Sequence, residues 1–182
     1  MTKELIVTIG ISGSGKSSWA AKMVQEAIDK YVVVNRDKIR ELLFGYTEEG
    51  IKDYYFRDDL RKLEKQVNRY EDLLIKEALA QGKTPIIDAT HLKREYLTRF
   101  KYWNVPVKLM WFDIELGGAI GRDANRTRRV GDEVITKQFR QYQSLKESLK
   151  QNPIDFTPVE IEVDYTLPPA FIFDIDGTLA HE

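Results

Sequence analysis

The sequence predicts an α/β fold in which helices cover both faces of a mainly parallel sheet. Short apolar, β-branched runs alternate with longer segments whose apolar residues recur every three or four positions. The first of these runs leads directly into a glycine-rich loop that opens a helix. Ligands of such folds lie at the carboxyl ends of the strands, so the functional residues are expected there.

The alternation defines each element in turn. The predicted strands cover residues 5–9, 31–34, 85–87 and 107–112, and the predicted helices cover residues 17–30, 58–81, 115–129 and 132–150. The helix over 58–81 has the strongest pattern, because apolar residues from Leu60 to Ala78 share one face and Gly82 follows as a C-cap. After Pro153 the pattern becomes irregular, so a domain boundary is expected near residue 152.

Length and composition exclude several classes of function. The 182 residues suffice for one domain with an appendage. A formal net charge of −1 gives no support to a general nucleic-acid or membrane-surface binder, so an anionic partner requires local clusters of charge. The absence of cysteine excludes disulfides and thiolate metal sites. The N-terminal apolar run has only the length of a strand, so we expect no membrane span and a cytoplasmic location.

The loop from Gly10 to Ser17, GISGSGKS, fits the phosphate-binding pattern GxxxxGK[ST] between a strand and a helix. Lys16 is expected to reach the β- and γ-phosphates of ATP, and the Ser17 hydroxyl to ligate Mg²⁺. The other candidates for nucleotide binding in this loop are Gly10, Gly13, Ser14, Gly15 and Ser18. A glycine-rich turn without a ligand would not explain the Lys-Ser pair. A GTPase or motor ATPase is the competing interpretation, but the sequence contains no NKxD motif.

The second strand delivers polar residues where an acceptor would bind. In NRDKIR, Asp37 is positioned to accept a hydroxyl proton, and Arg40, one helical turn later, to pair with a phosphate of the acceptor. The alternative is an N-capping Asp37 followed by a solvated basic turn, which would be favoured if no phosphate loop preceded it.

A second basic cluster follows the fourth strand. Arg122 and Arg126 lie one turn apart on a predicted helix, and Arg128 and Arg129 follow. The cluster suits a lid that closes over the nucleotide with an arginine at the γ-phosphate. A solvated basic face explains the spacing equally well.

The third strand ends in Asp88-Ala89-Thr90. Asp88 and Thr90 are candidates for binding the acceptor, with Asp88 orienting it or a Mg²⁺-bound water. Alternatively, Thr90 could cap the next helix. In residues 93–103 basic and aromatic residues alternate, which suits either a nucleic-acid surface or, as the favoured interpretation, an ordinary amphipathic helix.

These motifs together resemble the kinase domain of the bifunctional 5′-polynucleotide kinase 3′-phosphatases of bacteriophage type. The matching pieces run in order along the whole chain: LIVTIGISGSGKSSWA, VVVNRDKIR, IIDATHL, the pair Arg122 and Arg126, and FIFDIDGTL. The resemblance implies a P-loop kinase fold and transfer of the γ-phosphate of ATP to the 5′-hydroxyl of DNA or RNA, in nucleic-acid end healing. It also implies homo-oligomers and a location in a bacterium or a phage-infected cell.

The resemblance also implies a role for each site residue. Lys16 and Ser17 correspond to the phosphate and Mg²⁺ residues, Asp37 to the general base and Arg40 to the contact with the acceptor's 3′-phosphate. Arg126 corresponds to the lid arginine, with Arg122 as a neighbour in nucleotide binding.

The sequence departs from the family at three positions near the site. Ser12 replaces a frequent proline, Asp88 stands two positions before Thr90 where some relatives place the acid directly before it, and Arg128 competes with Arg126 for the lid role.

The C-terminus adds a second signature. Asp174 and Asp176 lie in DIDGT, which resembles the motif of haloacid dehalogenase-type phosphatases, where the first Asp is the nucleophile and the second the general acid. Residues 1–152 are therefore expected to form the kinase domain, and residues 153–182 a linker and the first strand of that second domain. Its other residues are missing from the sequence, so we expect no phosphatase activity. The tail suits a kinase domain separated just inside its second domain, or a vestige packed as an edge strand.

Two other functions are compatible with the phosphate loop. A P-loop kinase for a small-molecule hydroxyl would share Lys16 and Ser17 but would need a closed acceptor pocket. A nucleotide-dependent switch would bind nucleotide without acceptor-dependent ADP release. The DIDGT motif favours the polynucleotide kinase, and Asp37 argues against the switch. Strand type, DNA or RNA preference and choice of triphosphate are not determined by the sequence.

Overall fold

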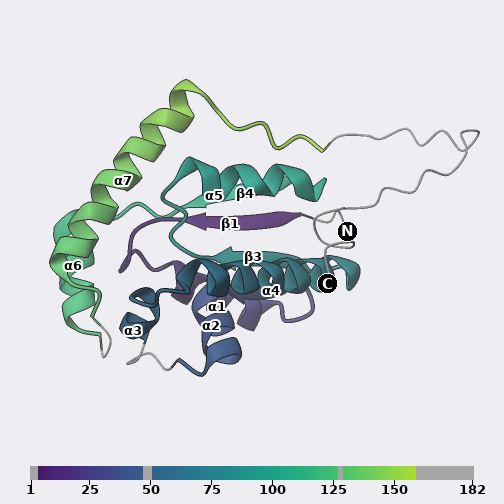
Figure 1. Ribbon diagram of the computed structural model, residues 1–182. Coiled ribbons are helices and arrows are strands. Elements are labelled where there is room, and N and C mark those ends of the chain that lie inside the picture. Colours follow the sequence, from purple (N-terminus) through teal and green to yellow (C-terminus); the bar gives the residue numbers. More distant parts are fainter. Residues whose placement is uncertain (1–3, 47–50, 127–128, 159–182) are drawn as a thin grey trace, which may run out of the picture.

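The computed structural model describes residues 4–46, 51–126 and 129–158 (Figure 1). Its sheet has the strand order β2-β3-β1-β4, and all three pairs of neighbouring strands are parallel. The strands are β1 (Leu5–Ile9), β2 (Tyr31–Asn35), β3 (Thr84–Asp88) and β4 (Val107–Trp111). The predicted parallel α/β fold is confirmed, and the phosphate loop begins at the carboxyl end of β1, an inner strand of this sheet.

Helices cover both faces of the sheet because successive strand residues point to opposite sides. Leu5, Val7 and Ile9 belong to the larger core, which includes residues of α4, α5 and α7. Ile6 packs instead with Ala20 of α1 on the other face. The helices are α1 (Lys16–Glu26), α2 (Arg36–Phe44), α3 (Ile51–Tyr55), α4 (Leu60–Ala80), α5 (Arg94–Thr98), α6 (Leu116–Ala124) and α7 (Asp132–Gln151), with a 3₁₀ helix η1 (Arg99–Trp103) after α5.

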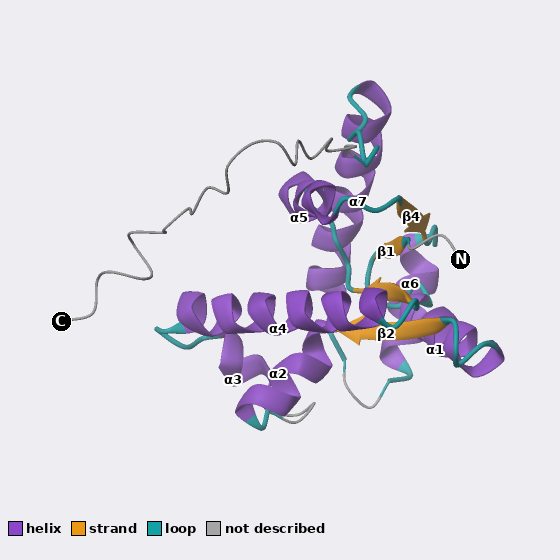
Figure 2. Ribbon diagram, turned by 90° about the vertical axis from the view of Figure 1, so that its right-hand side faces the viewer, coloured by secondary structure: helices purple, strands orange, loops and turns teal. Residues whose placement is uncertain are grey.

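Helix α4 is much longer than the strands it packs against. Its 21 residues span about 31 Å, whereas a five-residue strand spans about 17 Å. Figure 2 shows that α4 continues well past the carboxyl end of β2, with α2 and α3 beside its first half. The first turns of α4 therefore stand at the edge of the sheet where the phosphate loop and the polar strand ends also lie.

Two predicted helices end earlier than the apolar pattern indicates. Helix α1 ends at Glu26, and the backbone N–H of Tyr31 at the start of β2 bonds the carbonyl of Ala27. Helix α6 ends at Ala124 because the buried carboxylate of Asp123 accepts hydrogen bonds from the backbone N–H groups of Val130 and Gly131. This contact holds Val130 and Gly131 against the end of the helix. The predicted segment with Asp174 and Asp176 lies outside the described residues.

No helix in the described ranges combines the length and apolar character needed to cross a membrane. The segment over 93–103 forms α5 and η1 rather than one helix. Leu97 and Phe100 are fully buried there, while Tyr96 and Tyr102 are exposed. The favoured interpretation of an amphipathic segment with an aromatic core residue thus holds for Phe100.

Candidate active site

The phosphate loop has the tightly wound backbone that its glycines permit. Gly13 and Gly15 have φ values of +84° and +96°, a region that disfavours side chains. A β-carbon at Gly13 would lie 2.7 Å from the carbonyl oxygen of Ala119 in α6. A β-carbon at Gly10 would lie 2.8 Å from Ser14 Oγ. The loop is therefore packed between α1 and α6 and can adopt this path only with glycine at these positions.

Lys16 is folded into the loop that it belongs to. Its ammonium donates hydrogen bonds to the carbonyl of Ile11 at 2.7 Å and to Ser14 Oγ at 3.3 Å, and the residue is only 7% exposed. Burial lowers the pKa of Lys16 to about 8, Asp88 partly opposes this shift, and Arg126 adds to it. Both hydrogen-bond partners of this ammonium are neutral oxygens, and bound phosphates would give it anionic partners instead.

Ser17 and Ser18 follow at the start of α1, and both residues are exposed. A helix start combined with the glycine loop suits polyphosphate, since unpaired N–H groups and the helix dipole point at the same place. Within the described residues no group of three or more His, Cys, Asp or Glu side chains could hold a metal ion. A Mg²⁺ ion here would accordingly rely on the Ser17 hydroxyl, the nucleotide phosphates and water.

The ends of β2 and β3 are joined by a side-chain hydrogen bond. Asn35 and Asp88 are register partners, and Asn35 Nδ2 donates to Asp88 Oδ2 at 2.8 Å. Asp88 is buried, and its charge acts on the ammonium of Lys16. Thr90 accepts a hydrogen bond from the backbone N–H of Gly10 through its carbonyl oxygen. Since Lys93 precedes helix α5, the alternative in which Thr90 caps that helix is wrong.

His91 was missed by the sequence reasoning. It is buried with φ +46°, and its Nδ1 lies 2.7 Å from the carbonyl oxygen of Thr8 in β1. Burial lowers the pKa of His91 to about 4, so the ring is neutral at pH 7 and donates from Nδ1 to a carbonyl that can only accept. In the sequence, His91 is an isolated histidine after a strand. That pattern does not distinguish a buried hydrogen bond to a neighbouring strand from a catalytic or ligand-binding role.

Asp37 and Arg40 form a pair at the start of α2. Asn35 caps the helix by accepting hydrogen bonds from the backbone N–H groups of Asp37 and Lys38 at 2.9 and 3.1 Å, so the alternative with Asp37 as the cap is wrong. Arg40 Nη1 donates to Asp37 Oδ1 at 2.8 Å. The Asp37 side chain is 53% exposed, whereas that of Arg40 is 8% exposed and also bonds Glu64. The carboxylate thus faces solvent from a fixed position.

A network of ion pairs behind this pair was not predicted. Arg36 bonds Glu64 at 2.8 Å and the fully buried Glu71 at 2.6 Å, and the Tyr54 hydroxyl donates to Glu64 at 2.6 Å. Arg99 of η1 also pairs with Glu71. Burial opposes ionisation of Glu64, but hydrogen bonds from Arg40 and Tyr54 outweigh it and lower its pKa to about 2. The partners are 10 to 35 positions apart, beyond the spacing that a helical pattern reveals.

The predicted lid residues are only partly described. Arg122 is exposed and donates from Nη1 to the carbonyl of Gly13 at 3.2 Å. Arg126 is exposed and close enough for its charge to depress the pKa of Lys16. Arg128 lies outside the described residues, so the choice between it and Arg126 stays open. Gln138 of α7, which the sequence reasoning missed, accepts a hydrogen bond from the backbone N–H of Ser12 at 2.8 Å.

Comparisons with known proteins agree with this geometry. The family described as AAA domain matches residues 5–149. A protein from Autographa californica nuclear polyhedrosis virus, named for a bifunctional polynucleotide kinase/RNA ligase, is 27% identical over 190 aligned residues. That alignment covers 98% of this chain and 25% of the viral protein.

Two solved structures share the fold. A chain of the Pnkp1/Rnl/Hen1 RNA repair complex superposes with a TM-score of 0.66 at 22% identity, over 96% of this chain and 53% of that chain. A second structure of the Pnkp1/Rnl/Hen1 complex gives a TM-score of 0.55 at 22% identity, over 71% of this chain and 42% of that one. This chain spans about a quarter of the viral relative and about half of the first matched structure.

Proposed function

This chain belongs to the AAA domain family, and from that premise we propose that it transfers the γ-phosphate of ATP to the 5′-hydroxyl of DNA or RNA. The main observation behind the proposal is that the phosphate loop and the helix start that carries Asp37 lie at the same edge of the sheet. The phosphate loop with Lys16 lies beside Asp88, and Asp88 is hydrogen-bonded to Asn35, which caps the helix that carries Asp37. The kinase/ligase name of the viral relative supports the same acceptor class.

On the donor side, the phosphate loop holds the triphosphate. Lys16 would exchange its bonds to Ile11 and Ser14 for the β- and γ-phosphates, and its charge would stabilise the transferring group. Arg122 and Arg126 would contribute from α6. Mg²⁺, held by the Ser17 hydroxyl and the phosphates, would supply neutralisation of the charge on the phosphate oxygens.

On the acceptor side, Asp37 is the proposed general base. Its exposed carboxylate takes the proton of the 5′-hydroxyl as that oxygen bonds to the γ-phosphorus and the bond to the bridging oxygen breaks, which releases ADP. Arg40 orients Asp37 through the hydrogen bond from Nη1, and its guanidinium would also meet the phosphate on the 3′ side of the acceptor nucleoside.

Phosphoryl transfer is tested directly with γ-³²P-ATP and Mg²⁺. The acceptors are a short oligonucleotide with a 5′-hydroxyl and the same oligonucleotide with a 5′-phosphate. The proposal expects label on the first acceptor only. Bound ATP with label on neither acceptor would contradict the proposal and indicate a metabolite kinase or a switch. A homo-oligomeric state, a bacteriophage origin and a location inside the cell stay predictions from the sequence.

A further inference from the structure

We propose that the acceptor strand beyond its first nucleotide runs along the exposed face at the start of α4, where Arg61, Lys65 and Arg69 bind its phosphates. This inference rests on the proposed function and deepens it, because it assigns a path to nucleotides that take no part in the chemistry. The three cations are spaced four residues apart, so they share one face of the helix about 6 Å apart along its axis.

These three cations combine exposure with regular spacing on one helix face. All three residues are exposed, and within the described part of the chain none of them has an ion pair or a hydrogen bond from its side chain. Some exposed cations elsewhere have partners, such as Lys22 with Glu26 and Arg57 with Asp59, while others, such as Lys101 and Lys108, stand singly. In a chain whose net charge is −1, a row of three such cations on one helix face is the local cluster that an anionic ligand requires.

The position of the row connects it to the proposed acceptor site. Glu64 lies between Arg61 and Lys65 in the sequence, and its carboxylate bonds Arg40, which in turn bonds Asp37. Only one guanidinium therefore separates Asp37 from the first turns of α4. A strand whose 5′ end meets Asp37 and whose first phosphate meets Arg40 would reach this face of α4 next.

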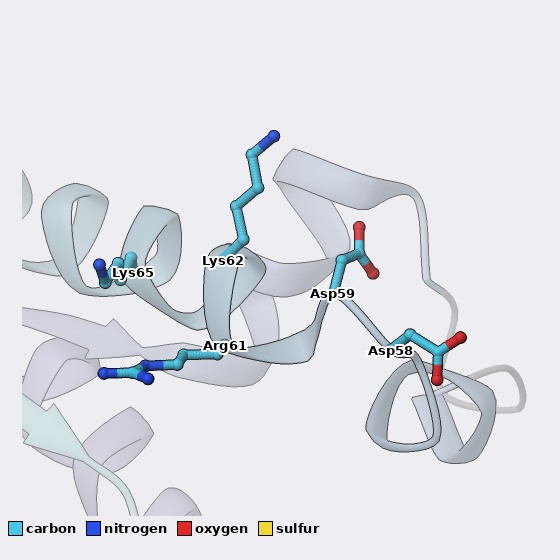
Figure 3. A pocket seen from close by; sticks show the side chains of 5 residues that line it. All are labelled: Asp58, Asp59, Arg61, Lys62 and Lys65. Carbon is cyan, nitrogen blue, oxygen red and sulfur yellow. The ribbon is translucent and has the colours of Figure 1, made fainter.

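Figure 3 shows the side chains around an open depression of about 480 Å³ at the start of α4. Arg61 and Lys65 extend toward the same side, away from the carboxylates of Asp58 and Asp59, which precede the helix. The carboxylates therefore do not cover the cationic ends. Lys62, Asp58 and Asp59 also line the depression, so its lining holds three cations and two carboxylates.

Aromatic side chains at the end of α3 favour a nucleic acid over an acidic protein as the ligand. The ring of Tyr55 lies 5.6 Å from the guanidinium of Arg40, and Phe56 is 85% exposed just before α4 begins. Cations that follow a backbone, with aromatic rings on which bases stack, are typical of surfaces that bind single strands. The carboxylates of an acidic protein would not stack on the exposed ring of Phe56, whereas a base would.

The test compares two acceptors of different length. The shorter acceptor is a nucleoside 3′-monophosphate, which reaches only Asp37 and Arg40, and the longer is a single-stranded 12-mer with a 5′-hydroxyl. The test variant carries Arg61→Gln, Lys65→Gln and Arg69→Gln, and a control variant loses three charges outside α4 through Lys101→Gln, Lys108→Gln and Lys150→Gln.

We expect the test variant to raise KM for the 12-mer by roughly tenfold at low salt, with KM for the mononucleotide unchanged. For the 12-mer, the slope of a plot of log KM against log salt concentration should decrease by about 2 in the test variant. Each phosphate contact to a single strand contributes about 0.7 to that slope, and three contacts are lost. The control variant should match the wild type. Phe56→Ala should raise KM for the 12-mer alone by about fivefold.

Other results would overturn the inference. Equal KM values for the 12-mer in the test variant and the wild type would remove α4 from the path. An equal rise in KM for both acceptors would mean that the substitutions act through the stability of the protein. An equal rise in KM in the control variant would mean that they act through its overall charge. Either result would contradict the inference. A wild type that phosphorylates neither acceptor would refute the proposed function itself, and the inference with it.

Discussion

The proposed donor and acceptor regions are built in different ways, although they share one edge of the sheet. The donor region is a continuous loop whose backbone N–H groups are expected to bind the phosphates. Its contacts, such as those of Lys16 with Ile11 and Ser14, join residues a few positions apart. The acceptor region is held by side-chain ion pairs between α2 and α4, such as Arg40 to Glu64 across 24 positions. The donor loop can be recognised from a sequence motif, whereas the ion pairs of the acceptor region form only when α4 packs against α2.

This difference predicts how each region fails. A change in the loop should act through backbone geometry and the donor nucleotide. A change in the ion pairs should act through the orientation of Asp37 and the acceptor, while the loop keeps its shape. The following variants separate the two regions.

Asp37→Ala should have the largest effect. Loss of a general base lowers kcat by about 10²–10⁴-fold, whereas ATP binding should be unchanged because Asp37 stands apart from the phosphate loop. Steady-state phosphoryl transfer and ATP titration calorimetry measure the two quantities. Near-normal kcat in this variant would remove Asp37 from the mechanism.

Lys16→Ala should lower kcat by about 10²–10³-fold and weaken ATP binding as well, because the lost ammonium contacts donor phosphates in the ground state and the transition state. The same two assays apply, so the pair of variants distinguishes the regions by their ATP affinity. An unchanged rate would overturn the assignment of the phosphate loop.

Gly13→Ala tests the backbone character of the donor region. The new β-carbon would lie 2.7 Å from the Ala119 carbonyl oxygen, and φ is +84°, so we expect a loss of roughly 3 kcal/mol in the free energy of unfolding. Gly82→Ala is the matched control, since φ is +73° there but no atom lies within 4 Å, and roughly 1 kcal/mol is expected. Urea denaturation measures both. Equal losses would show that the contact with α6 contributes nothing.

Glu64→Gln should have the smallest effect and should be confined to the acceptor region. Removing the charge that Arg36 and Arg40 share should cost about 2 kcal/mol of unfolding free energy and raise KM for the acceptor, with KM for ATP unchanged. The exposed Glu41, paired with Lys38, supplies the control variant Glu41→Gln. A larger effect on ATP than on the acceptor would contradict the separation of the two regions.

The contribution of Glu64 should also depend on pH. Its pKa is lowered to about 2 from an ordinary 4.5, so the stabilisation is fully present above pH 4.5 and is lost as the pH falls toward 2. The unfolding free energy of the wild type and of Glu64→Gln should therefore converge in that window. Parallel curves down to pH 2 would show that the ion pairs do not hold the carboxylate ionised.

Several structural features were correctly predicted from the sequence because they depend on local patterns. β1 has the predicted bounds, and the long helix α4 ends within one residue of its prediction with Gly82 in the left-handed conformation after it. The lengths of α1 and α6 were overestimated, because periodicity continues where a tertiary contact such as Asp123 to Gly131 ends the helix. The short helix α3 has too few residues for periodicity to be detected.

By itself, the sequence determined the fold class, the phosphate loop and the positions of Asp37 and Arg40, since each follows from a short pattern in which neighbouring residues specify the backbone. Only the tertiary structure decided that Arg40 is buried against Glu64, that Glu64 also pairs with Arg36, and that His91 bonds the Thr8 carbonyl in β1. The physical reason is that these contacts form between segments distant in the chain, and their partners are chosen by packing and charge.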